Sequence, residues 1–254
     1  MYVGIQTISW GSHPDVEHML REIKEAGYDG VEFYQNPMDL GKLDELYALL
    51  KKLRLRLLGA AGGALDAKID FIRAMMRADN LDWATSGLGD GWRVAFGPGN
   101  RRPYIYVDEW RDEWAKELNQ SDDLLFALHP HMFKPVQTAS EAEAVMNRYP
   151  QLRFLPDTAH LTVAGEDVRA VLERNYHRIE AVHLKDWSAV FGRAYQFYSR
   201  GFTELGKGDV LLDGVIDLLK KAGYNGWLVV EEDATMDPAG SAQRSRDWLR
   251  KRRI

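Results

Sequence analysis

The spacing of hydrophobic residues changes along the chain, with strand-like segments followed by helix-like segments. Short runs such as YVGIQTI (2–8) and GVEFY (30–34) are apolar and rich in β-branched and aromatic residues, which is typical of buried strands. Between them, residues 15–27 place apolar side chains on one helical face and end at Gly27, a common helix stop. The same β-then-α rhythm continues to the end of the chain.

Repeated β-then-α units predict an α/β fold, a single (β/α)8 TIM barrel in one domain over residues 1–254. The expected strands are 2–8, 30–34, 54–60, 92–97, 124–130, 152–157, 179–186 and 226–232. The expected helices are 15–27, 42–53, 67–79, 107–118, 139–149, 166–176, 212–224 and 241–253. Ser140 and Glu143 match a capping box, and Asp213 is the expected N-cap of the helix that begins near residue 212.

Composition narrows the class of protein. Apolar residues make up 45% of the 254 residues, enough for a large core, and the lack of cysteine excludes disulfides and thiolate metal sites. The net charge of −5 argues against nucleic acid as the main partner, because phosphate binding needs a basic surface. The basic tail RSRDWLRKRRI (244–254) is either a patch for an acidic partner or a closing helix with cations at its C-terminus.

No run approaches the ~18 apolar residues that suggest a membrane span. The first residues also lack the basic and long apolar segments of a secretory signal. We therefore expect a cytoplasmic protein without a membrane partner, and a homo-oligomer is compatible with the sequence.

Polar and charged residues collect where the expected strands end, and in a (β/α)8 barrel these ends open on one face, where active sites lie. Residues two apart in a strand share a face, so His183 and Lys185 can both point inward, whereas only one of Glu231 and Glu232 can. A single such residue is more often structural than functional, but the whole set favours a site. The set is Trp10, Glu32, His129, His131, Asp157, His160, His183, Lys185, Asp186, Glu231 and Glu232.

Carboxylates and imidazoles without thiols suit one divalent ion such as Mn²⁺, Mg²⁺, Co²⁺ or Zn²⁺. Such an ion would stabilise the enediolate formed when the C–H beside a carbonyl loses its proton. His160 and Lys185 are the first candidates for acid and base, and His131 is the next candidate. Lys185 is expected either to have a lowered pKa or to pair with Asp186. Glu32 either orients a substrate hydroxyl or a ligand, or makes a structural contact. Trp10 is a candidate substrate contact, and Glu231 is a candidate catalytic residue.

The motifs GYDGVEF, LHPHM, PDTAHL, AVHLKD, ELGKGDV and AGYNGWLVVE occur in the order and spacing of the xylose isomerase-like barrel superfamily, which includes sugar phosphate isomerases and epimerases. The chain resembles this superfamily over nearly its whole length, and least over residues 60–120. SWG, HPHM and DTAHL are most similar to the inosose dehydratase-like members.

The resemblance implies a metal site. Relatives hold one divalent metal with a Glu on strand five, an Asp on strand six, a His on strand seven and a Glu on strand eight. The three last positions are occupied here by Asp157, His183 and Glu231. His129 stands at the strand-five position in place of Glu, so His131 is an alternative ligand or a substrate contact. His160 matches a position that binds sugar hydroxyls in relatives.

Ketose epimerases of this superfamily carry a second glutamate six residues after the first, where this chain has Pro135. This departure favours dehydration or another isomerisation over 3-epimerisation. The expected function is therefore a metal-dependent isomerase, epimerase or dehydratase (a carbon–oxygen lyase) acting on a sugar or keto-polyol. Two alternatives are an endonuclease IV-like DNA repair enzyme, which would need more metal ligands, and an inactive sugar-binding barrel.

Two loops are candidates for a functional role. Residues 187–205 are too long for a simple connection and rich in aromatics, which predicts an ordered lid over the barrel mouth. Within it, Arg193 is either a contact for a substrate anion or an ordinary surface residue. The sequence GKGD (206–209) either cradles a phosphate or forms a tight turn.

Overall fold

Eight parallel strands form the centre of the protein. The structure is a computed structural model that describes residues 1–85, 92–97, 101–108, 110–111, 114–194, 201–233 and 235–254. The strands follow the order β6-β5-β4-β3-β2-β1-β10-β7 in one sheet. Their bounds are β1 (Tyr2–Gln6), β2 (Gly30–Phe33), β3 (Arg56–Ala60), β4 (Tyr104–Val107), β5 (Leu125–Leu128), β6 (Arg153–Phe154), β7 (Ala181–Leu184) and β10 (Trp227–Val230).

The two ends of this sheet meet. Parallel bridges join Phe154 to Ile179 and Asp157 to His183, and the His183 amide donates to the Pro156 carbonyl at 2.9 Å. The sheet therefore closes between β6 and β7, and the predicted (β/α)8 barrel is confirmed.

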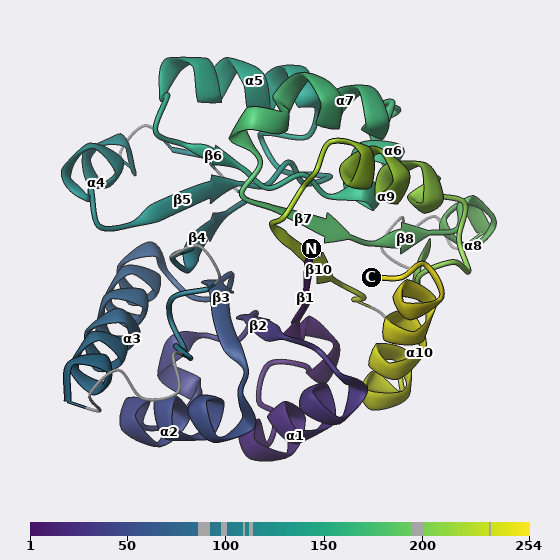
Figure 1. Ribbon diagram of the computed structural model, residues 1–254. Coiled ribbons are helices and arrows are strands. Elements are labelled where there is room, and N and C mark those ends of the chain that lie inside the picture. The colour runs from purple at the N-terminus through teal and green to yellow at the C-terminus, as the bar shows by residue number, and fades with distance from the viewer. Residues whose placement is uncertain (86–91, 98–100, 109, 112–113, 195–200, 234) are drawn as a thin grey trace.

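Helices surround the barrel on its outside (Figure 1). They are α1 (Val16–Ala26), α2 (Leu43–Leu53), α3 (Leu65–Thr85), α4 (Trp114–Gln120), α5 (Ala139–Arg148), α6 (Thr158–Val163), α7 (Val168–Asn175), α8 (Ala189–Ala194), α9 (Leu212–Lys221) and α10 (Pro238–Lys251). Short 3₁₀ helices span Thr7–Trp10, Pro37–Asp39 and Tyr176–Arg178. Among the described residues, none of the helices has both the length and the apolar character needed to cross a bilayer.

The last helix packs against the first. Arg246 donates to the Gly27 carbonyl at 2.9 Å and Arg250 to the Ala26 carbonyl at 2.8 Å, so α10 binds the C-terminal end of α1. Arg252 pairs with Asp213 on α9. These contacts engage three of the six cations of the basic tail within the protein, which favours the closing-helix interpretation over a patch for an acidic partner.

The expected fourth strand is wrong. Residues 92–97 do not form a strand; the Val94 carbonyl accepts from the Leu57 amide at 2.9 Å, beside the start of β3. The barrel strand is β4, Tyr104–Val107, which pairs with β3 and β5. The expected helix 107–118 is also wrong in its start, since Val107 ends β4 and α4 begins at Trp114.

Two expected caps are also wrong. The capping box of α5 is formed by Thr138 and Glu141, because the helix starts at Ala139 and Ser140 already lies inside its first turn. Likewise α9 begins at Leu212, so Asp213 lies in the first turn and Leu211 is the N-cap. Each prediction placed the N-cap two residues too late.

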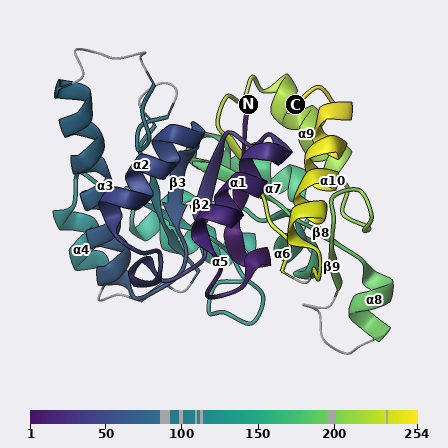
Figure 2. The ribbon, with the colours of Figure 1, turned by 90° about the horizontal axis from the view of Figure 1, so that it is seen from below.

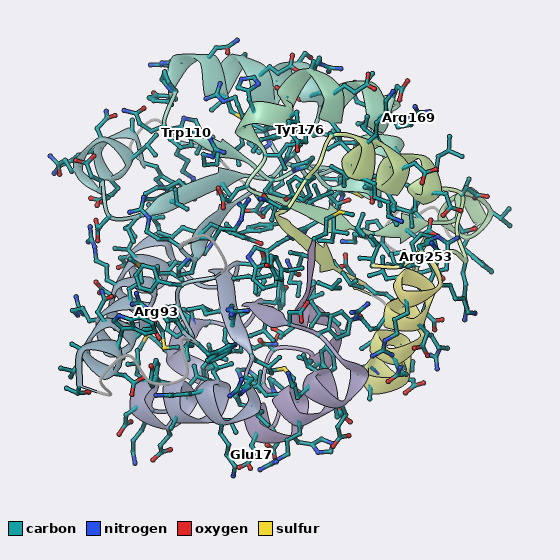
Figure 3. The ribbon with its side chains drawn as sticks, in the orientation of Figure 1. Glu17, Arg93, Trp110, Arg169, Tyr176 and Arg253 are labelled. Carbon is teal, nitrogen blue, oxygen red and sulfur yellow. The ribbon has the colours of Figure 1, made fainter. Side chains whose placement is uncertain are left out.

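Side chains inside the barrel are apolar along most of the strand length and polar at the carboxyl ends of the strands. A cluster of inward-facing residues fills the end where the strands begin: Leu58, Tyr104, Tyr106, Ala127, Leu155, Ala181, Trp227 and Val229. Gly30 makes room for this cluster, since a Cβ there would lie 2.2 Å from Leu58 Cδ1. Side chains fill the middle of the barrel in Figure 3. The carboxyl ends of the strands carry the polar residues.

Candidate metal and substrate site

His183 lies between two carboxylates at the end of β7. Its Nδ1 is 2.5 Å from Glu231 Oε2, and its Nε2 is 3.2 Å from Glu32 Oε2. All three side chains are buried. Burial lowers the pKa of His183, but Glu32 and Glu231 outweigh it and raise the pKa to about 10. The two carboxylates hold the imidazole in one orientation, with Nδ1 directed at Glu231.

Glu32 contacts the Nε2 atom of this histidine. Its carboxylate also accepts a hydrogen bond from the Gln6 amide at 2.6 Å and one from the Tyr104 hydroxyl. With three donors around it and no exposed surface, Glu32 supports a ligand rather than facing the mouth. Of the expected roles, orientation of His183 fits this geometry, and contact with a substrate stays a prediction.

Asp157 explains why β6 ends in an acid followed by a histidine. It is the N-cap of α6, where its Oδ1 accepts from the Ala159 amide at 2.7 Å and the His160 amide at 2.8 Å. Its Oδ2 is buried without a hydrogen-bond partner. Burial raises the pKa of Asp157, but His160 and His129 outweigh it and the pKa stays well below its usual range. One oxygen therefore orients the carboxylate, and the other is free for a ligand.

His129 at the end of β5 faces the same point. Its Nε2 is 3.6 Å from Asp157 Oδ2 and is likewise buried without a hydrogen-bond partner. Its Nδ1 is 2.8 Å from the Tyr106 hydroxyl, whose ring stacks on the imidazole at a centroid distance of 4.6 Å. Tyr106 thus fixes the ring so that Nε2 points at Asp157.

The four side chains can hold one divalent ion. Ligand atoms of His129, Asp157, His183 and Glu231 all lie within 4.8 Å of one another. Donors bound to a common ion at about 2.0–2.3 Å are roughly 3–4.5 Å apart, so small adjustments suffice. The two carboxylates match the charge of a divalent cation, and the unpartnered Asp157 Oδ2 and His129 Nε2 are the atoms that such an ion would satisfy. His131 lies outside this group.

Lys185 is fully buried beside the four donors. Its Nζ is 2.7 Å from Glu231 Oε1 and 2.8 Å from the Asp233 carboxylate. The expected lowered pKa is wrong: burial lowers the pKa of Lys185, but Asp233 and Glu231 outweigh it and raise the pKa. The expected partner Asp186 is wrong as well, because Asp186 binds backbone amides instead. Lys185 is therefore positioned as a cation.

His131 and His160 form a stacked pair next to Lys185. Their ring centroids are 3.9 Å apart, and both ring nitrogens of His160 are buried without hydrogen-bond partners. His131 Nδ1 is 2.6 Å from the Met132 carbonyl. Burial lowers the pKa of both histidines, and that of His160 falls well below its usual value. Neutral imidazoles at this position can accept a proton or bind hydroxyls.

Part of the loop 187–205 covers these residues. β9 (Phe202–Thr203) pairs antiparallel with β8 (Asp186–Trp187), and the Phe202 ring lies 4.0 Å from Lys185 Nζ and edge-on to His160. In Figure 2, α8 extends away from the body of the barrel. Residues 195–200 lie outside the described part, as does the side chain of Arg193, so its contact with a substrate anion stays a prediction, as does lid function for the whole loop.

Asp186 occupies the centre of the GKGD turn. Its carboxylate accepts hydrogen bonds from the Gly206, Gly208 and Val210 amides at 2.8, 2.9 and 3.1 Å. These amides are the groups that a phosphate would need, so the tight-turn interpretation is supported and the phosphate cradle is not. The carboxylate also ties the end of the loop to β8.

Asp186→Asn is expected to destabilise the protein by about 2–4 kcal/mol, because an amide nitrogen would face buried backbone donors that now share a carboxylate. Chemical denaturation measures this loss. Asp209→Asn is the control, because Asp209 accepts from one exposed amide, that of Ala189. Equal free energies of unfolding for the two variants would contradict the anchoring role.

The polar atom of Trp10 binds a helix on the outside of the barrel. Its indole nitrogen donates to Glu22 Oε2 on α1 at 2.7 Å, so its polar atom faces a helix. Its role as a substrate contact stays a prediction. Tyr104, Tyr106 and Asp233 were not predicted from the sequence. The tyrosines were hidden by the misplaced fourth strand, whereas Asp233 directly follows the acids at the end of the expected last strand and could have been found.

Comparison with known families gives one match over most of the chain. The family model described as xylose isomerase-like TIM barrel matches residues 20–252. Among solved structures, an IOLI protein with a bound zinc atom superposes with a TM-score of 0.69 at 14% identity, covering 99% of this chain and 97% of that one. The probable 3-DHS dehydratase AsbF of Bacillus anthracis gives 0.66 at 14%, covering 98% and 99%. At these identities the structures show the fold alone.

Curated relatives share more sequence. An inosose dehydratase of Geobacillus thermodenitrificans (strain NG80-2) is 32% identical over 171 residues, which cover 59% of this chain and 57% of that protein. The rhizopine catabolism protein MocC of Rhizobium meliloti is 29% identical over 280 aligned positions, covering 93% and 82%. The match thus spans little more than half the length of the inosose dehydratases.

Proposed function

Because the chain belongs to the xylose isomerase-like TIM barrel family, we propose that it is a divalent-metal-dependent dehydratase that removes water from a keto-polyol similar to an inosose. Isomerisation of a keto-sugar is the related alternative for the same site. The names of the curated relatives support the substrate class, and Pro135 at the position of the second epimerase glutamate supports dehydration.

The observation that carries this proposal is the pair of unpartnered buried atoms, Asp157 Oδ2 and His129 Nε2, next to His183 and Glu231. Leaving buried polar atoms without partners is costly unless a ligand satisfies them. His129, Asp157, His183 and Glu231 would hold the ion, whether Mn²⁺, Mg²⁺, Co²⁺ or Zn²⁺. A bound ion of this kind supplies Lewis-acid stabilisation of a developing enolate oxygen.

The protein's own residues would move the protons. His160, neutral and with both ring nitrogens unpartnered, would take the proton from the carbon beside the carbonyl. Lys185, held as a cation, would donate a proton to the hydroxyl that leaves from the next carbon as water. His131 packs on His160 and would bind a substrate hydroxyl, and Phe202 would exclude water from Lys185.

The same geometry weighs against the alternatives. Among the described residues one group of donors is found, whereas an endonuclease IV-like enzyme would need ligands for several metals. Arg246, Arg250 and Arg252 already bind carbonyls and a carboxylate within the protein, which makes them less available to DNA. A sugar-binding barrel without activity would not require the buried, unpartnered His160 next to a buried lysine.

Reconstitution with each of the four metals, followed by incubation with a panel of substrates, tests the proposal. The panel is a 2-keto-inositol, a ketohexose, a 3-keto-glycoside, dehydroshikimate and abasic-site DNA. We expect loss of water from the keto-inositol, with exchange of the hydrogen beside the carbonyl for deuterium in substrate recovered from D₂O. Full metal occupancy without turnover or exchange would instead support an inactive barrel, and DNA cleavage would support the nuclease.

A further inference from the structure

Asp233 lies beyond the end of β10 and takes no part in the group of four metal donors. It stands two residues after Glu231, and the two carboxylates contact the same amine. Lys185 Nζ lies between them, 2.7 Å from Glu231 Oε1 and 2.8 Å from Asp233 Oδ2. The side chain of Asp233 is 21% exposed, whereas that of Lys185 has no exposed surface. Asp233 is thus the more exposed of the two carboxylates that bind this lysine.

Glu231 is shared between two neighbours. Its Oε2 faces His183 Nδ1 at 2.5 Å within the donor group, and its Oε1 binds Lys185. A cation bound to one oxygen of a carboxylate draws on the negative charge that the other oxygen would offer to a metal, because the two oxygens share one charge. Lys185 would therefore compete with a metal for Glu231 unless a second anion held the amine.

We propose that Asp233 is a positioning residue that binds the Lys185 amine at the barrel mouth, and so leaves Glu231 free to bind metal and the lysine aimed at the substrate. The proposal rests on the proposed function in treating the four donors as a metal site and Lys185 as a group that acts on the substrate. Phe202 makes a third contact with the amine, since its ring centroid lies 4.0 Å from Lys185 Nζ. The amine is thus held by two carboxylates and one aromatic face, all buried or at the mouth.

Metal affinity separates this role from simple structural support. Asp233→Asn is expected to weaken Mn²⁺ binding by about tenfold, the size seen for partners that orient a ligand. Lys185→Met removes the competing cation, so the double variant Lys185→Met/Asp233→Asn should bind Mn²⁺ as well as Lys185→Met alone. Isothermal titration calorimetry on the full chain measures the affinities of wild type and the three variants. Asp123→Asn is the control, because Asp123 pairs with Arg73 on the surface.

Kinetics give a second measurement. With metal saturating, Asp233→Asn should lower kcat by roughly 10–100-fold and change KM less than about threefold, because the lysine is misplaced in the transition state while substrate binding is retained. The double variant should be no slower than Lys185→Met alone, since both changes act through one amine.

Metal-free protein gives a third measurement, which does not depend on activity. Mass spectrometry after treatment with an amine-acylating reagent should show faster labelling of Lys185 in Asp233→Asn than in wild type. Equal labelling, or weaker metal binding in Asp233→Asn that persists in the double variant, would overturn the proposal. Absence of metal binding and turnover in wild type would refute the proposed function, and the labelling result would still decide the role of Asp233.

Discussion

Glu231→Gln is expected to lower the affinity for divalent metal by more than about 100-fold, since even partners that only orient a ligand contribute 10–100-fold. The amide oxygen is uncharged and therefore a weaker ligand for a hard cation. Glu231 also contacts His183 and Lys185, so its loss leaves both without their shared carboxylate. Turnover should fall by orders of magnitude together with metal content. Metal analysis after dialysis, with thermal melts with and without Mn²⁺, measures both.

Glu232→Gln is the matched control, one residue further along the same chain segment. Its side chain points to the other face of the strand and accepts a hydrogen bond from the Ser241 hydroxyl on α10. Burial raises the pKa of Glu232, so an uncharged amide is tolerated there more easily. We expect wild-type metal content and activity within a few-fold. Full metal occupancy in Glu231→Gln would show that the site is misassigned.

Lys185→Met is expected to reduce turnover by about 10²–10⁴-fold, the usual contribution of a positioned proton donor, while metal content is retained. Methionine fills nearly the same volume in this fully buried position but carries no proton. It also leaves the Asp233 carboxylate without its cation, so the melting temperature should fall. Steady-state kinetics with saturating metal, together with metal analysis, separates the chemical effect from loss of the ion.

Lys42→Met is the control for this substitution. Lys42 is exposed and pairs with Glu45 three residues further on, so its replacement should change turnover and melting temperature little. If Lys185→Met retained turnover within about threefold of wild type, Lys185 would be a structural cation, because loss of a general acid costs far more than that. His160 and His131 would then be the remaining candidates for proton transfer.

The sequence by itself determined the fold class and the face of the barrel on which the polar residues lie. Hydrophobic periodicity is a local property, so the runs around Ile5 and Val229 could be recognised as strands without knowing their neighbours. Alternation along a strand is also local, and it placed His183 with Lys185 on one face and Glu232 opposite Glu231. These predictions needed only the chain direction and the pleat of a strand.

The tertiary structure alone decided which partner each side chain meets. The closure of β6 against β7 brings Asp157 next to His183, and the register of β10 against β7 places Glu231 and Asp233 around Lys185. The pKa of Lys185 was predicted in the wrong direction for this reason, since its sign depends on the carboxylates across the strand. Asp186 was likewise assigned to Lys185 because it is adjacent in sequence, whereas it binds amides about twenty residues away. Residues 92–97 and 104–107 are both β-rich, and only pairing with β3 and β5 selects the second, because strand hydrogen bonds form between segments far apart in the chain.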